Sequence, residues 1–174
     1  MTFSTLARAL SRLAWFCIAL LTLGWVFLVA QALIWPDLLA PDIPPEVAGM
    51  TVVPLAFAAA RAASLLTLVP AVIALVHAAR LLADFARGAV LTDKSAHHIR
   101  RIGAAIAVRA LLGAPAKTLS TALLTLPNPP GRQILSIGFS SDGLEMLIYG
   151  GLLFLIGAAM RLAARAAAEN AGFV

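Results

Sequence analysis

The sequence predicts an all-α, polytopic membrane protein with four transmembrane helices, from its composition, its long apolar runs and the placement of its charges. Of the 174 residues, 61% are hydrophobic and 12% are charged. Soluble domains are nearer to about 45–50% apolar and about 25% charged, so the excess apolar surface is suited to lipid. Four spans of roughly 20 residues with their loops fit this length, and we therefore expect one domain, residues 1–174.

Four apolar segments are the expected spans: residues 13–35, 52–76, 103–126 and 144–160. In the first, Trp15 and Trp35 are about 30 Å apart along a helix, which matches the hydrocarbon thickness. Both rings can therefore lie in interfacial aromatic belts. An alternative is a signal peptide cleaved near Ala30-Gln31-Ala32, although its apolar core is longer than the usual ~7–15 residues. Cleavage would leave the topology of the remaining spans unchanged.

The second span is expected to belong to a helix from about Thr51 to Arg87, ended by Gly88 as a left-handed cap. Such a helix is roughly 55 Å long, whereas the bilayer core needs only about 30 Å. We therefore expect it to project from the membrane, with a kink near Pro70. The next helix is expected to begin with Thr92 as its N-cap and Asp93 in its first turn, where the helix dipole favours an acid.

The segment between the second and third spans, residues 77–102, is predicted to be a cytosolic helical hairpin. It holds five of the thirteen basic residues: Arg80, Arg87, Lys94, Arg100 and Arg101. Four more flank the first and last spans: Arg8, Arg12, Arg161 and Arg165. Only Arg132 lies in a loop expected outside. Because cytoplasmic loops are enriched in Lys and Arg, both termini and the hairpin are predicted to lie in the cytoplasm, and this placement argues against nucleic-acid binding.

The hairpin sequence LLADFARGAVLTDKSAHHIRRIG resembles a motif of the bacterial "domain of unknown function 2975" (DUF2975) membrane protein family. The family's aromatic helix end, glycine, turn threonine and Ile-Gly reopening of the next span are matched by Phe85, Gly88, Thr92, Ile102 and Gly103. The chain departs from the family at Leu91, where an aromatic residue is common, and its tail around Glu169-Asn170 is similar to the family's ending. The resemblance implies a four-span bacterial inner-membrane protein of undetermined activity, often thought to act alongside a small helix-turn-helix regulator. It supplies no catalytic residues.

Charged residues inside the predicted spans form a second candidate site. Arg61, Lys117 and Glu145 are all expected in the outer half of the bilayer, where a charge costs roughly 2.5–3.5 kcal/mol on insertion scales and usually faces the bundle or water. One interpretation is an outward-open polar site for an anion or a proton. The other is snorkelling with a single Arg61–Glu145 or Lys117–Glu145 pair. If Arg109 marks the inner boundary of the third span, Lys117 lies near mid-bilayer; if Ile102 marks it, Arg109 can snorkel inward.

The sequence contains no constellation typical of catalysis, a metal site or a cofactor site. No Ser or Thr has a His and a carboxylate at suggestive spacing on the same side, and no glycine-rich phosphate loop is present. His77, His97 and His98 are the candidate metal ligands. Adjacent helical residues point about 100° apart and His77 is offset by about 8 Å along the axis, so a solvated basic face with ordinary pairs such as Asp84–Arg87 is preferred.

The sequence therefore predicts a non-enzymatic inner-membrane protein, regulatory or accessory, with no cofactor. Its basic hairpin is expected to engage a cytosolic or membrane partner or anionic lipid headgroups, each basic residue adding about 1 kcal/mol near a membrane surface. The alternative is a small transporter or channel subunit built around Arg61, Lys117 and Glu145. Four spans are few for a transporter, so this alternative requires an oligomer. Neither the partner nor a ligand follows from the sequence.

Overall fold

The computed structural model describes residues 3–34, 53–90, 92–136, 138 and 140–171. These residues form five helices: α1 (Phe3–Ile34), α2 (Pro54–Ala63), α3 (Leu65–Ala86), α4 (Asp93–Thr125) and α5 (Ser141–Ala171). Because α2 and α3 follow each other almost without a break, four segments are long and apolar enough to cross a membrane: Phe3–Gln31, Pro54–Ala86, Asp93–Thr125 and Ser141–Glu169. The predicted all-α class with four potential spans is confirmed.

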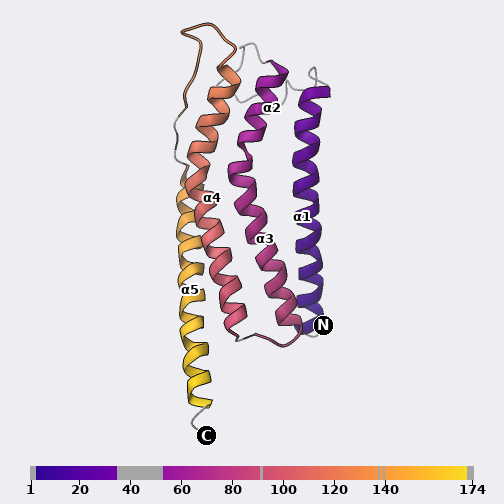
Figure 1. The fold of residues 1–174 in the computed structure, drawn as a ribbon, viewed down its shortest axis with the longest axis vertical. Coiled ribbons are helices and arrows are strands. Elements are labelled where there is room, and N and C mark those ends of the chain that lie inside the picture. Colours follow the sequence, from indigo (N-terminus) through magenta and orange to yellow (C-terminus); the bar gives the residue numbers. More distant parts are fainter. Residues whose placement is uncertain (1–2, 35–52, 91, 137, 139, 172–174) are drawn as a thin grey trace.

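The helices lie side by side along one long axis (Figure 1). The most extensive packing is between α4 and α5, followed by α3 with α4 and α1 with α3. The start of α1, the α3–α4 turn and the end of α5 all lie at the same end of the bundle (Figure 1). The described ends of the chain therefore lie at the same end of the bundle as the connection between α3 and α4.

The predicted cytosolic hairpin of residues 77–102, extending beyond the other helices, is not supported. On one side, α1 packs along it: the rings of Phe3 and Phe85 are 6.4 Å apart, and the Ser11 hydroxyl donates a 2.9 Å hydrogen bond to the Ala79 carbonyl. On the other side, Arg161 of α5 pairs with Asp93 at 3.3 Å. The segment is the packed end of the bundle because α1 and α5, with 32 and 31 residues, extend well beyond the spans expected for them.

The second span is interrupted at Ser64, six residues before Pro70, near which the sequence predicts a kink. A proline donates no backbone hydrogen bond and crowds the carbonyl four residues earlier, here that of Leu66, but Pro70 and Leu66 both lie inside α3 and the break comes before it. There the Ser64 N–H bonds to the Arg61 carbonyl at 3.0 Å, one residue closer than in an α-helix. Trp25 of α1 donates its indole N–H to the Ser64 hydroxyl at 2.8 Å, which ties the break to the neighbouring helix.

The α3–α4 turn has the end signals that the sequence indicates. Gly88 has φ +83°, a left-handed conformation that glycine adopts without steric cost. The Thr92 side chain accepts a 3.2 Å hydrogen bond from the Ser95 N–H, and Asp93 occupies the first turn of α4. Both the predicted cap residue and the predicted N-cap are confirmed.

Helices α4 and α5 touch backbone to backbone at three glycines: Gly103, Gly150 and Gly157. A Cβ added at Gly150 would lie 2.6 Å from the Ala107 nitrogen, and one at Gly157 would lie 2.6 Å from the Arg100 nitrogen. Small residues allow membrane helices to approach closely, where van der Waals packing replaces the hydrophobic effect that lipid cannot supply. This contact holds α5 against the rest of the bundle.

Candidate functional site: a basic end and an intramembrane cavity

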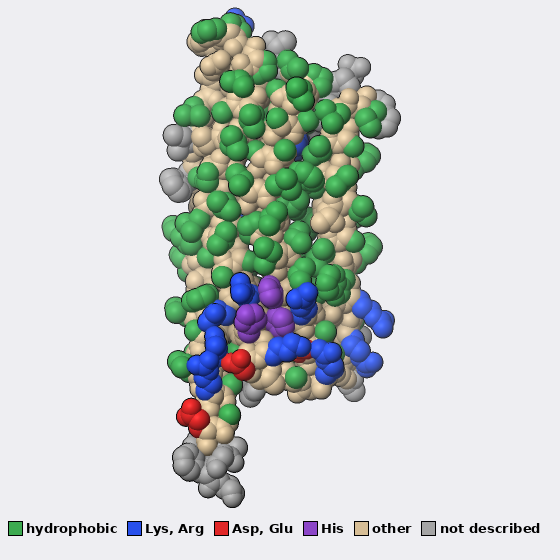
Figure 2. All heavy atoms as spheres, viewed as in Figure 1, with side chains coloured by type: hydrophobic (Ala, Val, Ile, Leu, Met, Phe, Trp, Pro, Cys, Tyr) green, Lys and Arg blue, Asp and Glu red, His purple; other side chains and the backbone are tan. Residues whose placement is uncertain are grey.

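On the face shown in Figure 2, basic side chains gather near the end of the bundle that carries the α3–α4 turn, and hydrophobic side chains are spread along the rest of the bundle. All four long segments contribute to this basic end, which we define by nine residues: Arg8, Arg12, Arg80, Arg87, Lys94, Arg100, Arg101, Arg161 and Arg165. Within the described part of the chain, the acids on the same end are Asp84, Asp93 and Glu169. The five predicted hairpin residues therefore belong to a larger surface built from α1, α3, α4 and α5.

Asp84 is the charged centre of the basic end. Its carboxylate is only 2% exposed, pairs with Arg87 and lies 3.3 Å from the Lys94 ammonium group. Its second oxygen is 3.7 Å from Nε2 of the buried His98. Because a buried carboxylate needs partners that offset its lost hydration, these contacts join the last turn of α3 to the first turns of α4.

Three histidine rings meet beside this carboxylate, which corrects the expectation that they stay apart. The ring centroids are separated by 5.2 Å for His77–His98, 6.1 Å for His77–His97 and 5.9 Å for His97–His98. The side chains extend toward one another and so span the distance along the helix axis that separates His77 from the other two histidines. The Nδ1 atoms of His77 and His98 are 2.9 Å apart, so one ring donates and the other, with a bare nitrogen, accepts. Among the described His, Cys, Asp and Glu residues, no group of three or more is placed to hold a metal ion.

The predicted partner-binding residues differ in how their charges are used. Arg87 and Lys94 contact Asp84 but leave about two thirds of their side chains exposed, at 66% each. Arg100 is half-buried, with its guanidinium 5.6 Å from the centroid of the Phe154 ring, a cation–π distance. Arg80 and Arg101 are exposed as well, and neither of them contacts Asp84, so these two are the cations of the predicted set chosen for charge reversal below.

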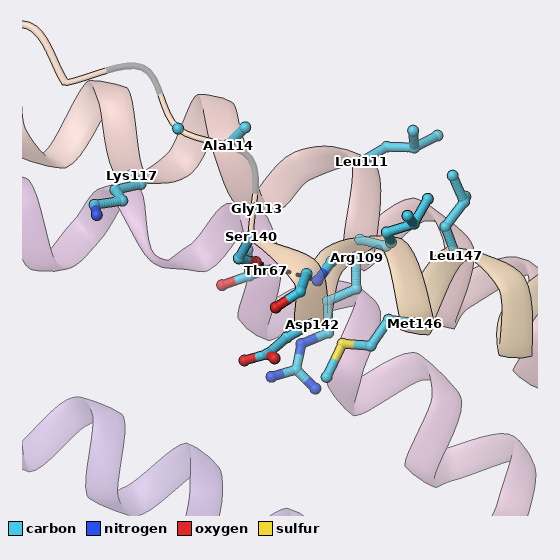
Figure 3. Close-up of a pocket in the computed structure, with 15 residues that line it drawn as sticks. Thr67, Arg109, Leu111, Gly113, Ala114, Lys117, Ser140, Asp142, Met146 and Leu147 are labelled. Carbon is cyan, nitrogen blue, oxygen red and sulfur yellow. Dashed lines mark hydrogen bonds between the residues drawn. The ribbon is translucent and has the colours of Figure 1, made fainter.

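A cavity of about 750 Å³ lies toward the other end, between α4 and α5. Its polar lining comes from Arg109 and Lys117 of α4, Thr67 of α3, and Ser140 and Asp142 at the start of α5. Figure 3 shows the side chains of Arg109 and Asp142 reaching into the same part of the cavity, while Lys117 lies further along α4. Two cations, Arg109 and Lys117, and one acid, Asp142, therefore line a largely apolar cavity.

A second cavity, of about 580 Å³, shares part of this lining. Thr67, Arg109 and Met146 line both cavities, and Leu21 and Trp25 of α1 also line the second. Arg109 stands at the middle of the 33-residue α4. A cation at mid-helix thus lies where the two cavities meet.

The structure brings only one of the three predicted intramembrane charges to this cavity. Lys117 lines it, but Arg61 lies on α2 with its guanidinium 4.9 Å from the centroid of the Phe57 ring. Glu145 is exposed on α5 and, like Arg61, is not among the residues that line the two cavities. In the sequence, Arg109 fits either the inner boundary of the third span or a snorkelling residue, and the predicted polar site did not include it. The available signal was its position eight residues before Lys117 within one apolar helix.

No family of known proteins, no curated protein and no solved structure matches this chain. The class that the fold and the charge distribution define is a helical bundle with four potential membrane spans and one basic end.

Proposed function

We propose that the protein is a non-enzymatic accessory or regulatory subunit of the bacterial inner membrane that binds an acidic surface of a cytosolic partner through its basic end. The observation that carries this proposal is the convergence of nine basic residues from all four spans on one end. The positive electrostatic potential of such a cluster attracts an acidic partner and fixes its orientation. The positive-inside rule assigns this end to the cytoplasm, and the resemblance to the DUF2975 family favours a small regulatory protein as the partner.

Reversing the two accessible charges tests the proposal. We expect Arg80→Glu combined with Arg101→Glu to lower the yield of a photo-crosslinked complex about tenfold, with the crosslinker at the exposed Val90 of the turn. Placing like charges opposite each other costs several kcal/mol, and about 1.4 kcal/mol already corresponds to tenfold. The measurement is crosslinking in living cells, with the captured protein identified by mass spectrometry.

The matched control is Arg132→Glu, a charge reversal at an exposed position outside the basic end, which should leave the yield unchanged. An undiminished yield in the double variant contradicts the partner surface. Cysteine labelling at position 90, in a chain whose single Cys17 is replaced by alanine, tests the sidedness separately. Labelling of position 90 from the periplasm in intact cells contradicts the cytoplasmic assignment.

A second candidate function is transport or conduction of a small anion, which the two adjoining cavities at Arg109 favour. We expect anion flux into proteoliposomes to be lost in Arg109→Gln, because its guanidinium is the cation common to both cavities. Arg61→Gln removes an equal charge from a position outside both linings and should keep the flux. No flux above that of empty vesicles for the unmodified protein excludes this function.

A further inference from the structure

A third hollow, of about 430 Å³, lies within the basic end, between the first part of α1 and the last turns of α3. Its lining is Arg8, Ser11, Arg12, Ala83, Ala86 and Arg87. Three of these six residues carry a guanidinium group, and none is acidic. The hollow differs from the Arg80 and Arg101 surface because α1 supplies two of its three cations.

The helices hold this hollow open by their residue sizes and by one buried contact. Ala83 and Ala86 present only methyl groups toward α1, so space remains between the two backbones. Ser11 is 8% exposed and donates its hydroxyl hydrogen to the Ala79 carbonyl at 2.9 Å. This bond fixes the spacing of α1 and α3 beside the hollow. Arg8 and Arg12 are four residues apart and therefore lie on the same face of α1.

The electrostatics of the hollow are unfavourable in the protein alone. Like charges at this helical spacing oppose each other by about 0.2–0.5 kcal/mol, and Arg87 adds a third cation from α3. Asp84 offsets part of the Arg87 charge, but it also contacts Lys94. Arg8 uses its Nε–H in a 3.3 Å hydrogen bond to the Ser4 carbonyl, while a guanidinium has five N–H donors. Donors and positive charge thus remain for an anion.

We propose that this hollow binds the phosphate of an anionic phospholipid headgroup. Planar guanidinium groups match the geometry of phosphate oxygens in paired hydrogen bonds, and basic pockets between membrane helices on the cytoplasmic side are suited to such headgroups. Arg12 directly precedes the apolar part of α1, where Leu13 and Phe16 are 55% and 64% exposed. A lipid whose phosphate lies in the hollow can therefore place its chains along this apolar face.

The test is a binding titration of the purified full chain in detergent, followed by native mass spectrometry. The probes are phosphatidylglycerol, zwitterionic phosphatidylcholine and inorganic phosphate. We expect phosphatidylglycerol to bind at least about tenfold more tightly than phosphatidylcholine. Arg8→Gln with Arg12→Gln should abolish that preference, because tenfold corresponds to about 1.4 kcal/mol, within the worth of one charge-assisted hydrogen bond.

Two further variants separate a shaped site from general attraction by charge. Arg80→Gln with Arg101→Gln removes the same charge from the same end and should change the affinity less than about twofold, since these residues do not line the hollow. Ala83→Leu keeps every charge but fills the hollow, and should lower the affinity as strongly as the two arginine substitutions. Both double arginine variants should unfold at the temperature of the unmodified protein, because the substituted arginines are exposed.

The outcomes are distinguishable from one another and from those of the partner experiment. Phosphatidylglycerol binding that millimolar inorganic phosphate does not displace supports the lipid as the source of the phosphate. Inorganic phosphate binding with the same dependence on Arg8 and Arg12 keeps the phosphate site but assigns it to a soluble ligand, which overturns the lipid proposal. The site is overturned if the Arg8/Arg12 and Arg80/Arg101 double variants lose phosphatidylglycerol affinity equally. It is also overturned if Ala83→Leu leaves that affinity unchanged. None of these readouts depends on capture of a protein at Val90.

Discussion

Replacing Gly150 by alanine is expected to destabilise the protein by about 1–3 kcal/mol, the usual cost of overpacking a close contact. The added methyl group would lie 2.6 Å from the Ala107 nitrogen and 2.8 Å from the Gly103 carbonyl oxygen. These are backbone atoms, which cannot rotate away, so α4 and α5 must separate along their contact. The measurement is the free energy of unfolding in mixed detergent micelles titrated with dodecyl sulfate.

The next residue provides the control. An alanine Cβ at Gly151 has no atom within 4 Å, and alanine is favoured over glycine in a helix by up to about 1 kcal/mol. Gly151→Ala should therefore be neutral or mildly stabilising, opposite in sign to Gly150→Ala. Equal effects at the two positions would show that α5 does not use the Gly150 face against α4.

Asp84→Asn is the second substitution with a large expected effect. The asparagine keeps the shape of the side chain but removes the negative charge that faces Arg87, Lys94 and His98 at the centre of the basic end. An amide nitrogen in place of one carboxylate oxygen also offers a donor where Arg87 and Lys94, which can only donate, need an acceptor. Loss of a partner at a buried polar site costs about 1–3 kcal/mol, and the same unfolding titration should show a loss of that size.

Asp93→Asn is the matched change at an exposed acid. The Asp93 side chain is 63% exposed and pairs with Arg161 at 3.3 Å, and exposed ion pairs are worth about 0–1 kcal/mol. This variant should stay close to the unmodified protein. If Asp84→Asn is as mild as Asp93→Asn, the buried carboxylate does not join α3 to α4 energetically.

Local signals in the sequence predicted the local structure well. The apolar runs identified all four potential spans, and the turn chemistry of Gly88 and Thr92 identified the cap and the N-cap between α3 and α4. These features depend only on neighbouring residues. The first turns of α1 and the last turns of α5 were not predicted as part of these helices. Hydropathy marks the part of a helix that is suited to lipid, and not the more polar turns that continue it.

The composition of the sites depends on contacts between helices, which the sequence does not encode in a readable pattern. Arg109 and Asp142 line one cavity although 33 positions separate them in the chain. The convergence of His77 with His98 depends on how far α3 is shifted along α4. The sequence indicated which residues were costly in lipid, but only the packing of α3, α4 and α5 determines which of them share a cavity.

If the basic end lies at the lipid headgroups, it also sets how deep the other residues of α4 lie in the bilayer. With His98 at the headgroup level, Arg109 lies eleven residues, or about 17 Å, further along α4, and Lys117 lies nineteen residues, or about 29 Å, along it. The hydrocarbon layer is about 30 Å thick. On that placement, Arg109 would lie close to the bilayer midplane and Lys117 at the far surface. A guanidinium at that depth requires hydration or a counter-ion, and the acid that lines the same cavity is Asp142.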